Sequence, residues 1–119
     1  MAWEVYVLDD VEQWMFGLDK RAFNRIQQAI DQLESVGPGL GRPTVDTIKG
    51  SRHPNLKELR AGTVRILFAF DPVRRAVLLV AGDKLGLWSR WYKVAVPLAE
   101  RRFDDWLAEL AGERSDDGR

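Results

Sequence analysis

Residues 56–83 read LKELRAGTVRILFAFDPVRRAVLLVAGD, and this stretch decides the fold. Segment 63–70 alternates apolar side chains with others, a pattern typical of a half-buried strand. Segment 55–60 reads as a second strand, and the continuously apolar segment 76–81 suits a central strand. Each junction between them contains a Gly or a Pro in a short turn. The sequence therefore predicts three consecutive antiparallel strands.

Three helices and one more strand are expected outside this stretch. Alternation over 2–8 predicts a strand, and the apolar spacing that follows predicts a short helix ending near Gly17. Asp19 can cap a second helix, which Gly37-Pro38 ends, and Pro97 suits the first turn of a last helix. The apolar faces expected for the helices are Val11, Trp14, Met15 and Leu18; Phe23, Ile26, Ile30 and Leu33; and Ala99, Phe103, Trp106, Leu107 and Leu110.

The predicted order is β-α-α-β-β-β-α. It describes an α+β domain in which a helix hairpin packs on a twisted, mainly antiparallel, four-stranded sheet, since the first strand must join the same sheet to bury its apolar side. We expect one domain over residues 1–111, with an irregular, basic and Trp-rich segment over 83–96. Residues 112–119 are expected to form a disordered tail.

Composition favours a protein that stays in the cytoplasm. The chain has no Cys, which removes disulfides and thiolate sites and suits a reducing compartment. The N-terminal MAWEVYVLDD lacks the basic region of a signal peptide, and no apolar run approaches the roughly 20 residues that span a bilayer.

The formal net charge of zero hides a segregation along the chain. Residues 1–41 carry three basic and seven acidic side chains, a net of −4. Residues 42–93 carry eleven basic and four acidic, a net of +7, and residues 94–119 carry four basic and seven acidic, a net of −3. A basic middle that coincides with the predicted sheet suggests a face that binds a polyanion such as RNA, although uneven surface charge is the simpler explanation.

The order and spacing of several short motifs resemble those of the RelE/ParE superfamily, and more closely those of its phage-derived HigB-like branch. The resemblance covers roughly residues 2–110. The motifs are Ile48-Lys49-Gly50, Leu56-Lys57-Glu58-Leu59-Arg60, Val64-Arg65-Ile66-Leu67-Phe68-Ala69-Phe70, Val77-Leu78-Leu79-Val80-Ala81-Gly82-Asp83-Lys84, Trp91-Tyr92 and Pro97-Leu98-Ala99-Glu100-Arg101.

This resemblance implies the toxin of a type II toxin–antitoxin pair. For the RNA-cutting branch it implies an endoribonuclease that cuts messenger RNA on the ribosome by metal-free attack of the 2′-hydroxyl. ParE-type members inhibit DNA gyrase on the same scaffold, so gyrase inhibition without cleavage is the alternative. A nucleic-acid-binding module that has lost its catalytic function is a third reading.

Carried over to this chain, the resemblance implies catalytic roles for Arg60, Arg65 and Lys84 on the concave face of the sheet. A guanidinium suits a phosphate because it binds two oxygens and never deprotonates. We expect Arg65 to be the stronger phosphate contact and Arg65→Ala to leave the fold intact, with a salt bridge to Glu58 as the structural alternative. Tyr92 and Lys84 are candidates for proton transfer.

The general base stays unassigned, because Leu56 and Glu58 stand where RelE-type enzymes often carry two lysines. His53 is expected to be a solvated surface residue, and Trp91 to seal the end of the sheet. No spacing in the chain fits a metal site, so we expect no metal or other cofactor. The candidate RNA-binding residues, which join charge to base stacking, are Lys49, Arg52, Lys57, Trp88, Arg90 and Lys93.

The expected partners are messenger RNA, the ribosome and a cognate antitoxin that contains a helix-turn-helix, with no membrane. The antitoxin is expected either to cover the 42–93 block with acidic side chains or to dock on the acidic helix hairpin. Both routes give a salt-sensitive association.

Overall fold

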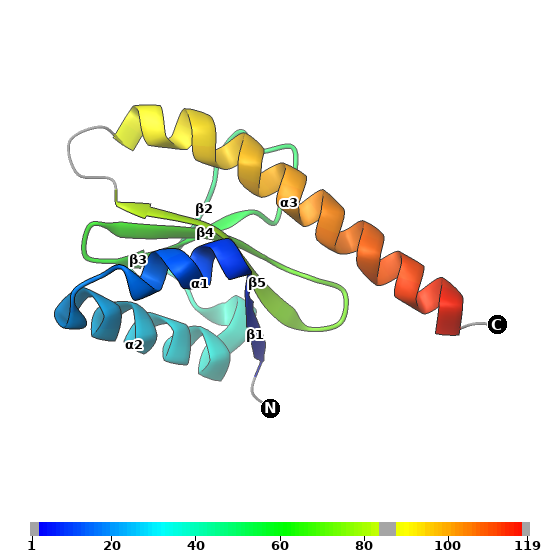
Figure 1. The fold of residues 1–119 in the computed structure, drawn as a ribbon, viewed down its shortest axis with the longest axis horizontal. Helices are drawn as coiled ribbons and strands as arrows, with labels where there is room; N and C mark the ends of the chain where they lie inside the picture. Colours follow the sequence, from blue (N-terminus) through cyan, green and yellow to red (C-terminus); the bar gives the residue numbers. More distant parts are fainter. Residues whose placement is uncertain (1–2, 84–87, 118–119) are drawn as a thin grey trace.

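A five-stranded sheet lies between a helix hairpin on one face and one long helix on the other (Figure 1). The structure, a computed structural model, describes residues 3–83 and 88–117. Its elements are β1 (Glu4–Val7), α1 (Asp9–Phe16), α2 (Lys20–Val36), the 3-10 turn η1 (Gly37–Gly39), β2 (Val45–Thr47), β3 (Lys57–Ala61), β4 (Val64–Phe70), β5 (Arg75–Asp83) and α3 (Trp88–Asp117).

The strands lie in the order β1-β5-β4-β3-β2. The β3-β4-β5 meander is antiparallel and β1 joins the same sheet, as predicted. The structure adds that β1 lies at the edge of the meander, parallel to β5. The expected count of four strands was wrong, because β2 adds a fifth, antiparallel to β3. Only three residues long, β2 carries a single buried apolar side chain, Val45, too little to produce a periodic signal.

Each face of the sheet has its own core. The α1–α2 side packs around Ile26, Leu33, Ile66, Phe68 and Leu78, which are almost wholly buried. The α3 side packs around Leu56, Leu67, Val77, Leu79 and Ala99. The alternation in β4 therefore serves both layers, since its even-numbered residues face the hairpin and its odd-numbered residues face α3.

Local signals fix the helix hairpin as predicted. The Asp19 carboxylate accepts a hydrogen bond of 2.8 Å from the backbone N–H of Ala22 and caps α2. Gly37 ends α2 with a φ of 70°, and its position leaves no room for a side chain because the Trp3 indole lies against it. The chain must therefore turn at Gly37 beneath the first strand.

The long helix α3 corrects three expectations. It begins at Trp88, inside the segment that was expected to be irregular, and it runs through Gly112 to Asp117, where a disordered tail was expected. Pro97 lies inside the helix and not in its first turn. It is tolerated on the exposed side of α3, where water can hydrate the carbonyl that loses its helical partner.

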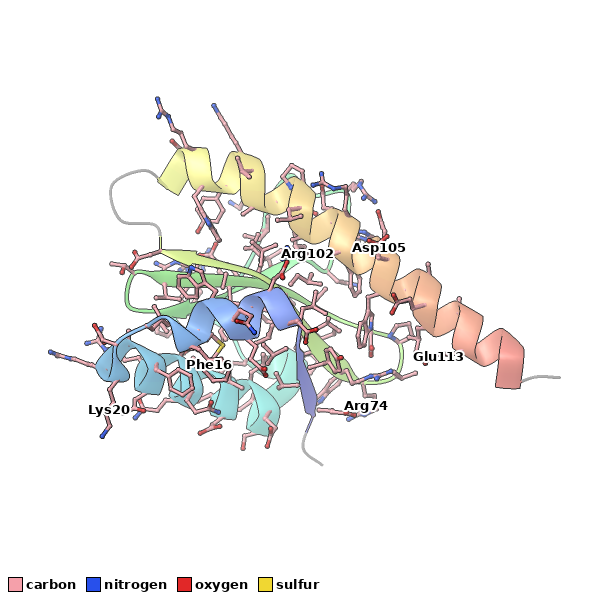
Figure 2. The ribbon with its side chains drawn as sticks, in the orientation of Figure 1. Phe16, Lys20, Arg74, Arg102, Asp105 and Glu113 are labelled. Carbon is pink, nitrogen blue, oxygen red and sulfur yellow. The ribbon has the colours of Figure 1, made fainter. Side chains whose placement is uncertain are left out.

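A polar bridge joins the two layers. Arg102 of α3 donates hydrogen bonds of 2.6 Å to the Leu79 carbonyl and 2.6 Å to Asp10 at the start of α1. Figure 2 shows Arg102 between α3 and the beginning of α1. Among the described residues, no helix is both long enough and apolar enough to span a bilayer.

Candidate functional site

The two predicted catalytic arginines lie side by side on the face of the sheet that α3 covers. Arg60 of β3 and Arg65 of β4 are direct cross-strand partners, and Gly82 of β5 continues the same row opposite Arg65. The tight turn at residues 61–63 sets this register. The sequence thus placed both arginines on one face correctly.

Glu58 is the centre of the group, although the sequence analysis assigned it no catalytic role. Its side chain is buried, and its Oε1 lies 3.0 Å from the Nε of Arg60 and 3.0 Å from the Nε of Arg65. Its Oε2 accepts a 2.5 Å hydrogen bond from the Tyr92 hydroxyl. All three neighbours therefore present hydrogen-bond donors or positive charge to this carboxylate. The signal available in the sequence was an acidic residue between Leu56 and Arg60 on one face of the predicted strand.

Arg65 is buried, and it is held by an ion pair and by two hydrogen bonds to backbone carbonyls. Its side chain is 9% exposed, and its Nη1 donates hydrogen bonds of 2.6 Å to the Gly62 carbonyl and 2.9 Å to the Val64 carbonyl. Arg65 also pairs with Glu58 across the hairpin, and this pair is the salt bridge that the sequence offered as the structural alternative for Arg65. A charged group this buried must be paired to be tolerated.

Arg60 is the accessible arginine of the pair. Its side chain is 33% exposed and is shared between Glu58 and Asp46, whose Oδ2 lies 3.2 Å from its Nη2. Burial, the largest single influence, lowers the pKa of Arg60. The two carboxylates together outweigh burial, so the pKa of Arg60 is raised. One side of its guanidinium is therefore anchored while the other reaches solvent.

Tyr92 reaches this group from the second turn of α3. The sequence predicted an irregular segment there, and for that reason it could not place the Tyr92 side chain. Burial and the hydrogen bond to Glu58 raise the pKa of Tyr92, an effect that Arg65 only partly offsets. The neighbouring Trp91 lies with its indole directly over Gly82, where any side chain would collide with the ring. This contact confirms that Trp91 seals the end of the sheet, and it fixes the position of Tyr92.

The remaining predicted residues do not join the group around Glu58. Lys49, Arg90 and Lys93 are exposed, and Lys57 lies on β3 with its Nζ 3.5 Å from the Thr47 hydroxyl. The alternation of β3 directs Lys57 away from the face that carries Arg60, as predicted. Lys84 and the side chain of Trp88 lie outside the described residues.

A second polar cluster ties the loop before β3 to the middle of α3. Arg52 pairs with Asp104 and donates its backbone N–H to Glu100 at 2.8 Å, while Ser51 donates a 2.8 Å hydrogen bond to the same carboxylate. The His53 Nε2 lies 2.8 Å from Asp104. His53 is part-buried and edge-on to Phe103, so the expectation of a solvated surface histidine was wrong.

These contacts lower the pKa values of the two carboxylates in the loop cluster. Hydrogen bonds from Arg52 and His53 lower the pKa of Asp104 to about 2. The hydrogen bond from the Ser51 hydroxyl lowers the pKa of Glu100, and the backbone N–H of Arg52 adds a smaller effect in the same direction. The cluster is a structural fastening between loop and helix, and it holds a candidate RNA-binding residue, Arg52, by its side chain.

Comparison with known proteins gives a consistent family. The model of the phage-derived Gp49-like family (DUF891) matches residues 13–104. The chain is 52% identical over 110 residues to a putative toxin HigB3 of Mycobacterium tuberculosis, covering 91% of this chain and 96% of that protein. It is 46% identical over 108 residues to a putative toxin HigB2 of the same organism, covering 87% of this chain but only 54% of that longer protein.

Among solved structures, the fold resembles RelE in an archaeal RelE–RelB complex from Pyrococcus horikoshii OT3. The TM-score is 0.60 at 19% sequence identity, covering 72% of this chain and 99% of that chain. At this level of identity the match establishes a shared fold, which confirms the predicted RelE-like α+β architecture. The chain belongs to the phage-derived Gp49-like family, as a homologue of HigB toxins with a RelE-like fold.

Proposed function

We propose that the chain is the toxin of a toxin–antitoxin pair and that it inhibits translation by cutting messenger RNA on the ribosome. The observation that carries the proposal is the convergence of Arg60, Arg65 and Tyr92 on one buried carboxylate, Glu58. Two fixed cations beside a phenol match what cleavage of a phosphodiester requires.

The two arginines divide the work on the phosphate. RNA cleavage by a 2′-hydroxyl places extra negative charge on the phosphorus centre, and preorganised cations stabilise that charge. Arg60 is the residue that contacts the phosphate, because a third of its side chain is exposed, whereas the buried Arg65 adds positive charge from behind it. This proposal differs from the expectation that Arg65 is the stronger contact.

The start of α3 supplies the surface along which the RNA lies. Trp91 and Tyr92 form an edge-to-face pair with ring centroids 4.9 Å apart, and the exposed Arg90 and Lys93 flank them. Aromatic edges beside cations favour single-stranded RNA, whose bases can stack while its phosphates are neutralised. Lys84 and Trp88 remain candidates for the same surface.

Translation in vitro with purified protein, followed by primer extension on the message, tests this function. The wild-type chain is expected to yield truncated messages, and Arg60→Ala is expected to lower the cleavage rate by about 10²–10³, as for loss of one charge-stabilising donor. Arg42→Ala is the matched control, since Arg42 also pairs with Asp46 but is 73% exposed. Intact messages together with inhibited gyrase supercoiling would replace this function by the ParE-like alternative.

The proposed antitoxin docks on the helix hairpin. An apolar groove of about 300 Å³ between β1, α1 and α2 includes Val7, Met15 and Phe23 in its walls, and the carboxylates of Glu12 and Glu34 line it as well. Apolar walls with an acidic rim fit a basic amphipathic helix. Arg60 and Arg65 already pair with carboxylates of this chain, which weakens the case for an acidic cover over the basic block.

Phe16 offers a direct test of this docking site. It stands 67% exposed at the end of α1 and stacks on Phe23 at 6.3 Å between ring centroids (Figure 2). Phe16→Asp is expected to weaken binding to the product of the adjacent reading frame at least tenfold, while Val94→Asp, which alters an equally exposed apolar residue on α3, leaves binding unchanged. Equal affinities for both variants and the wild type would contradict the hairpin site.

A further inference from the structure

We propose that the start of α2 binds backbone phosphates of the message next to the cut, through the side chains of Lys20, Arg21 and Arg25, here called the α2 subsite. The inference deepens the proposed function and rests on it, because it says where the RNA continues beyond Arg60 and Arg65. It adds a cationic site to a part of the chain in which the sequence indicated only an acidic surface.

The acidic N-terminal block keeps all of its positive charge in one place. Residues 1–41 carry three basic side chains, and these are the three of the α2 subsite, in the first two turns of α2. All three are exposed, and within the part of the chain that the structure describes none of them forms an ion pair with a carboxylate. Arg21 and Arg25 are four residues apart and therefore share one face of the helix. Cations without an internal partner are the ones available to a polyanion.

The α2 subsite lies beside the turn that joins the two strands of the catalytic arginines. Figure 1 shows the start of α2, the β3–β4 turn and the start of α3 at the same end of the molecule. The Nη1 of Arg25 lies 2.9 Å from the point where a Cβ on Gly62 would stand, so a glycine lets the guanidinium rest against the turn. The Gly62 carbonyl accepts the 2.6 Å hydrogen bond from Arg65. A single glycine therefore separates Arg25 from Arg65.

A cavity of about 410 Å³ opens between α2 and this turn. Arg21, Arg25 and Thr63 line it, and none of the described residues in its walls is aromatic. Guanidinium and hydroxyl groups donate hydrogen bonds to phosphate oxygens and fix the register of a nucleic acid without reading its bases. The cavity therefore fits the sugar-phosphate backbone and not a stacked base.

Two carboxylates, Asp19 and Asp83, also line the cavity and limit its attraction for an anion. The Asp19 carboxylate has a structural task, since its Oδ1 accepts the 2.8 Å hydrogen bond from the backbone N–H of Ala22 that caps α2. Asn caps a helix as well as Asp does, so Asp19→Asn removes a negative charge and keeps the cap. A phosphate site then predicts opposite effects for Asp19→Asn and Arg25→Gln.

Binding of a short single-stranded oligoribonucleotide to the purified chain, followed by fluorescence anisotropy over a range of salt concentrations, tests the α2 subsite. Arg21→Gln and Arg25→Gln change exposed helical positions to another good helix former, so both variants are expected to fold. Each is expected to weaken binding about tenfold, as for loss of one charge-assisted hydrogen bond. Each should also reduce the slope of log affinity against log salt by about 0.7. Asp19→Asn is expected to strengthen binding about two- to fivefold.

Arg74→Gln is the matched control, because it removes the same charge from the turn between β4 and β5. Figure 2 shows Arg74 far from Lys20. Its affinity for the oligonucleotide is expected to equal that of the wild type. Equal weakening by Arg74→Gln and Arg25→Gln would overturn the subsite, because the effect would then follow from net charge alone.

Cleavage on the ribosome separates the α2 subsite from the catalytic group. Because Arg21 and Arg25 lie beyond Gly62 from Arg65, their variants are expected to raise the KM and to keep the single-turnover rate at saturation within threefold of the wild type. Weaker binding to empty ribosomes, with unchanged affinity for the oligonucleotide, would assign these arginines to ribosomal RNA and overturn the message path. Weaker binding to the product of the adjacent reading frame alone would overturn it as well.

The outcomes distinguish the α2 subsite from the function on which it rests. A wild-type chain that binds the oligonucleotide through Arg25 but leaves messages intact contradicts the proposed function alone. An active wild-type chain whose Arg25→Gln variant binds and cuts equally well overturns the subsite alone.

Discussion

Replacement of Arg65 provides the sharpest test of how the site is built. The sequence led us to expect that Arg65→Ala leaves the fold intact, but the structure predicts a substantial loss of stability. The variant removes a buried partner of Glu58 and leaves the Gly62 and Val64 carbonyls without their 2.6 Å and 2.9 Å hydrogen bonds. Breaking a buried ion pair from one side costs about 3–5 kcal/mol.

The lower end of that range applies because Glu58 keeps Arg60 and Tyr92 as partners. For a domain of this size, a loss of about 3 kcal/mol lowers the Tm by roughly 10 °C. Urea unfolding followed by Trp fluorescence measures the free energy of unfolding directly. Arg60→Ala, with its more exposed and more weakly held side chain, is the matched control and should cost about 1 kcal/mol or less. Equal losses for both variants, or a loss below 1 kcal/mol for Arg65→Ala, would refute the reasoning.

Three further predictions concern packing, pH and metal dependence. Gly82→Ala is expected to lower the free energy of unfolding by about 1–3 kcal/mol, because the added Cβ collides with the Trp91 indole. Gly112→Ala on α3, where nothing lies near the added Cβ, should be neutral or stabilising, and thermal unfolding compares the two variants. The lowered pKa of Asp104 means that its contacts stabilise the fold above pH 3.8 and lose that effect as the pH falls towards 2, so Asp104→Asn should flatten the acid limb of a stability–pH curve. If arginines supply the positive charge at the phosphate as proposed, message cleavage should persist in excess EDTA once ribosomes are otherwise kept intact or bypassed, and a specific need for zinc or manganese would contradict the mechanism.

Local patterns were enough for most of the fold. Alternation over 63–70 and the cap at Asp19 act between near neighbours, so one sequence reveals them. The start of α3 was missed although Trp91, Ala95, Ala99 and Phe103 recur every four residues along it, because the basic and aromatic composition of 83–96 suggested an irregular segment. Helical spacing was the better guide there.

The site was less predictable because its contacts are not local. The register of the β3–β4 turn already brings Arg60, Arg65 and Glu58 together, and these lie within eight residues of sequence. Tyr92 meets Glu58 across 34 residues, and His53 meets Asp104 across 51. Which partner a polar side chain finds over such distances depends on how α3 crosses the sheet, which no periodicity in the sequence determines.

The charge segregation along the chain also has a different meaning once the chain is folded. Arg52 of the basic block pairs with Asp104 in the acidic C-terminal block, and Arg102 of that block pairs with Asp10 in the acidic N-terminal block. Folding thus neutralises part of the charge of residues 42–93 in internal ion pairs. The net charge of +7 for this block therefore overstates the positive charge that is available to an RNA. An RNA-binding surface of the kind proposed would depend on exposed cations such as Lys49, Arg90 and Lys93. With few such cations, the proposed RNA binding is expected to show only a shallow dependence of affinity on salt.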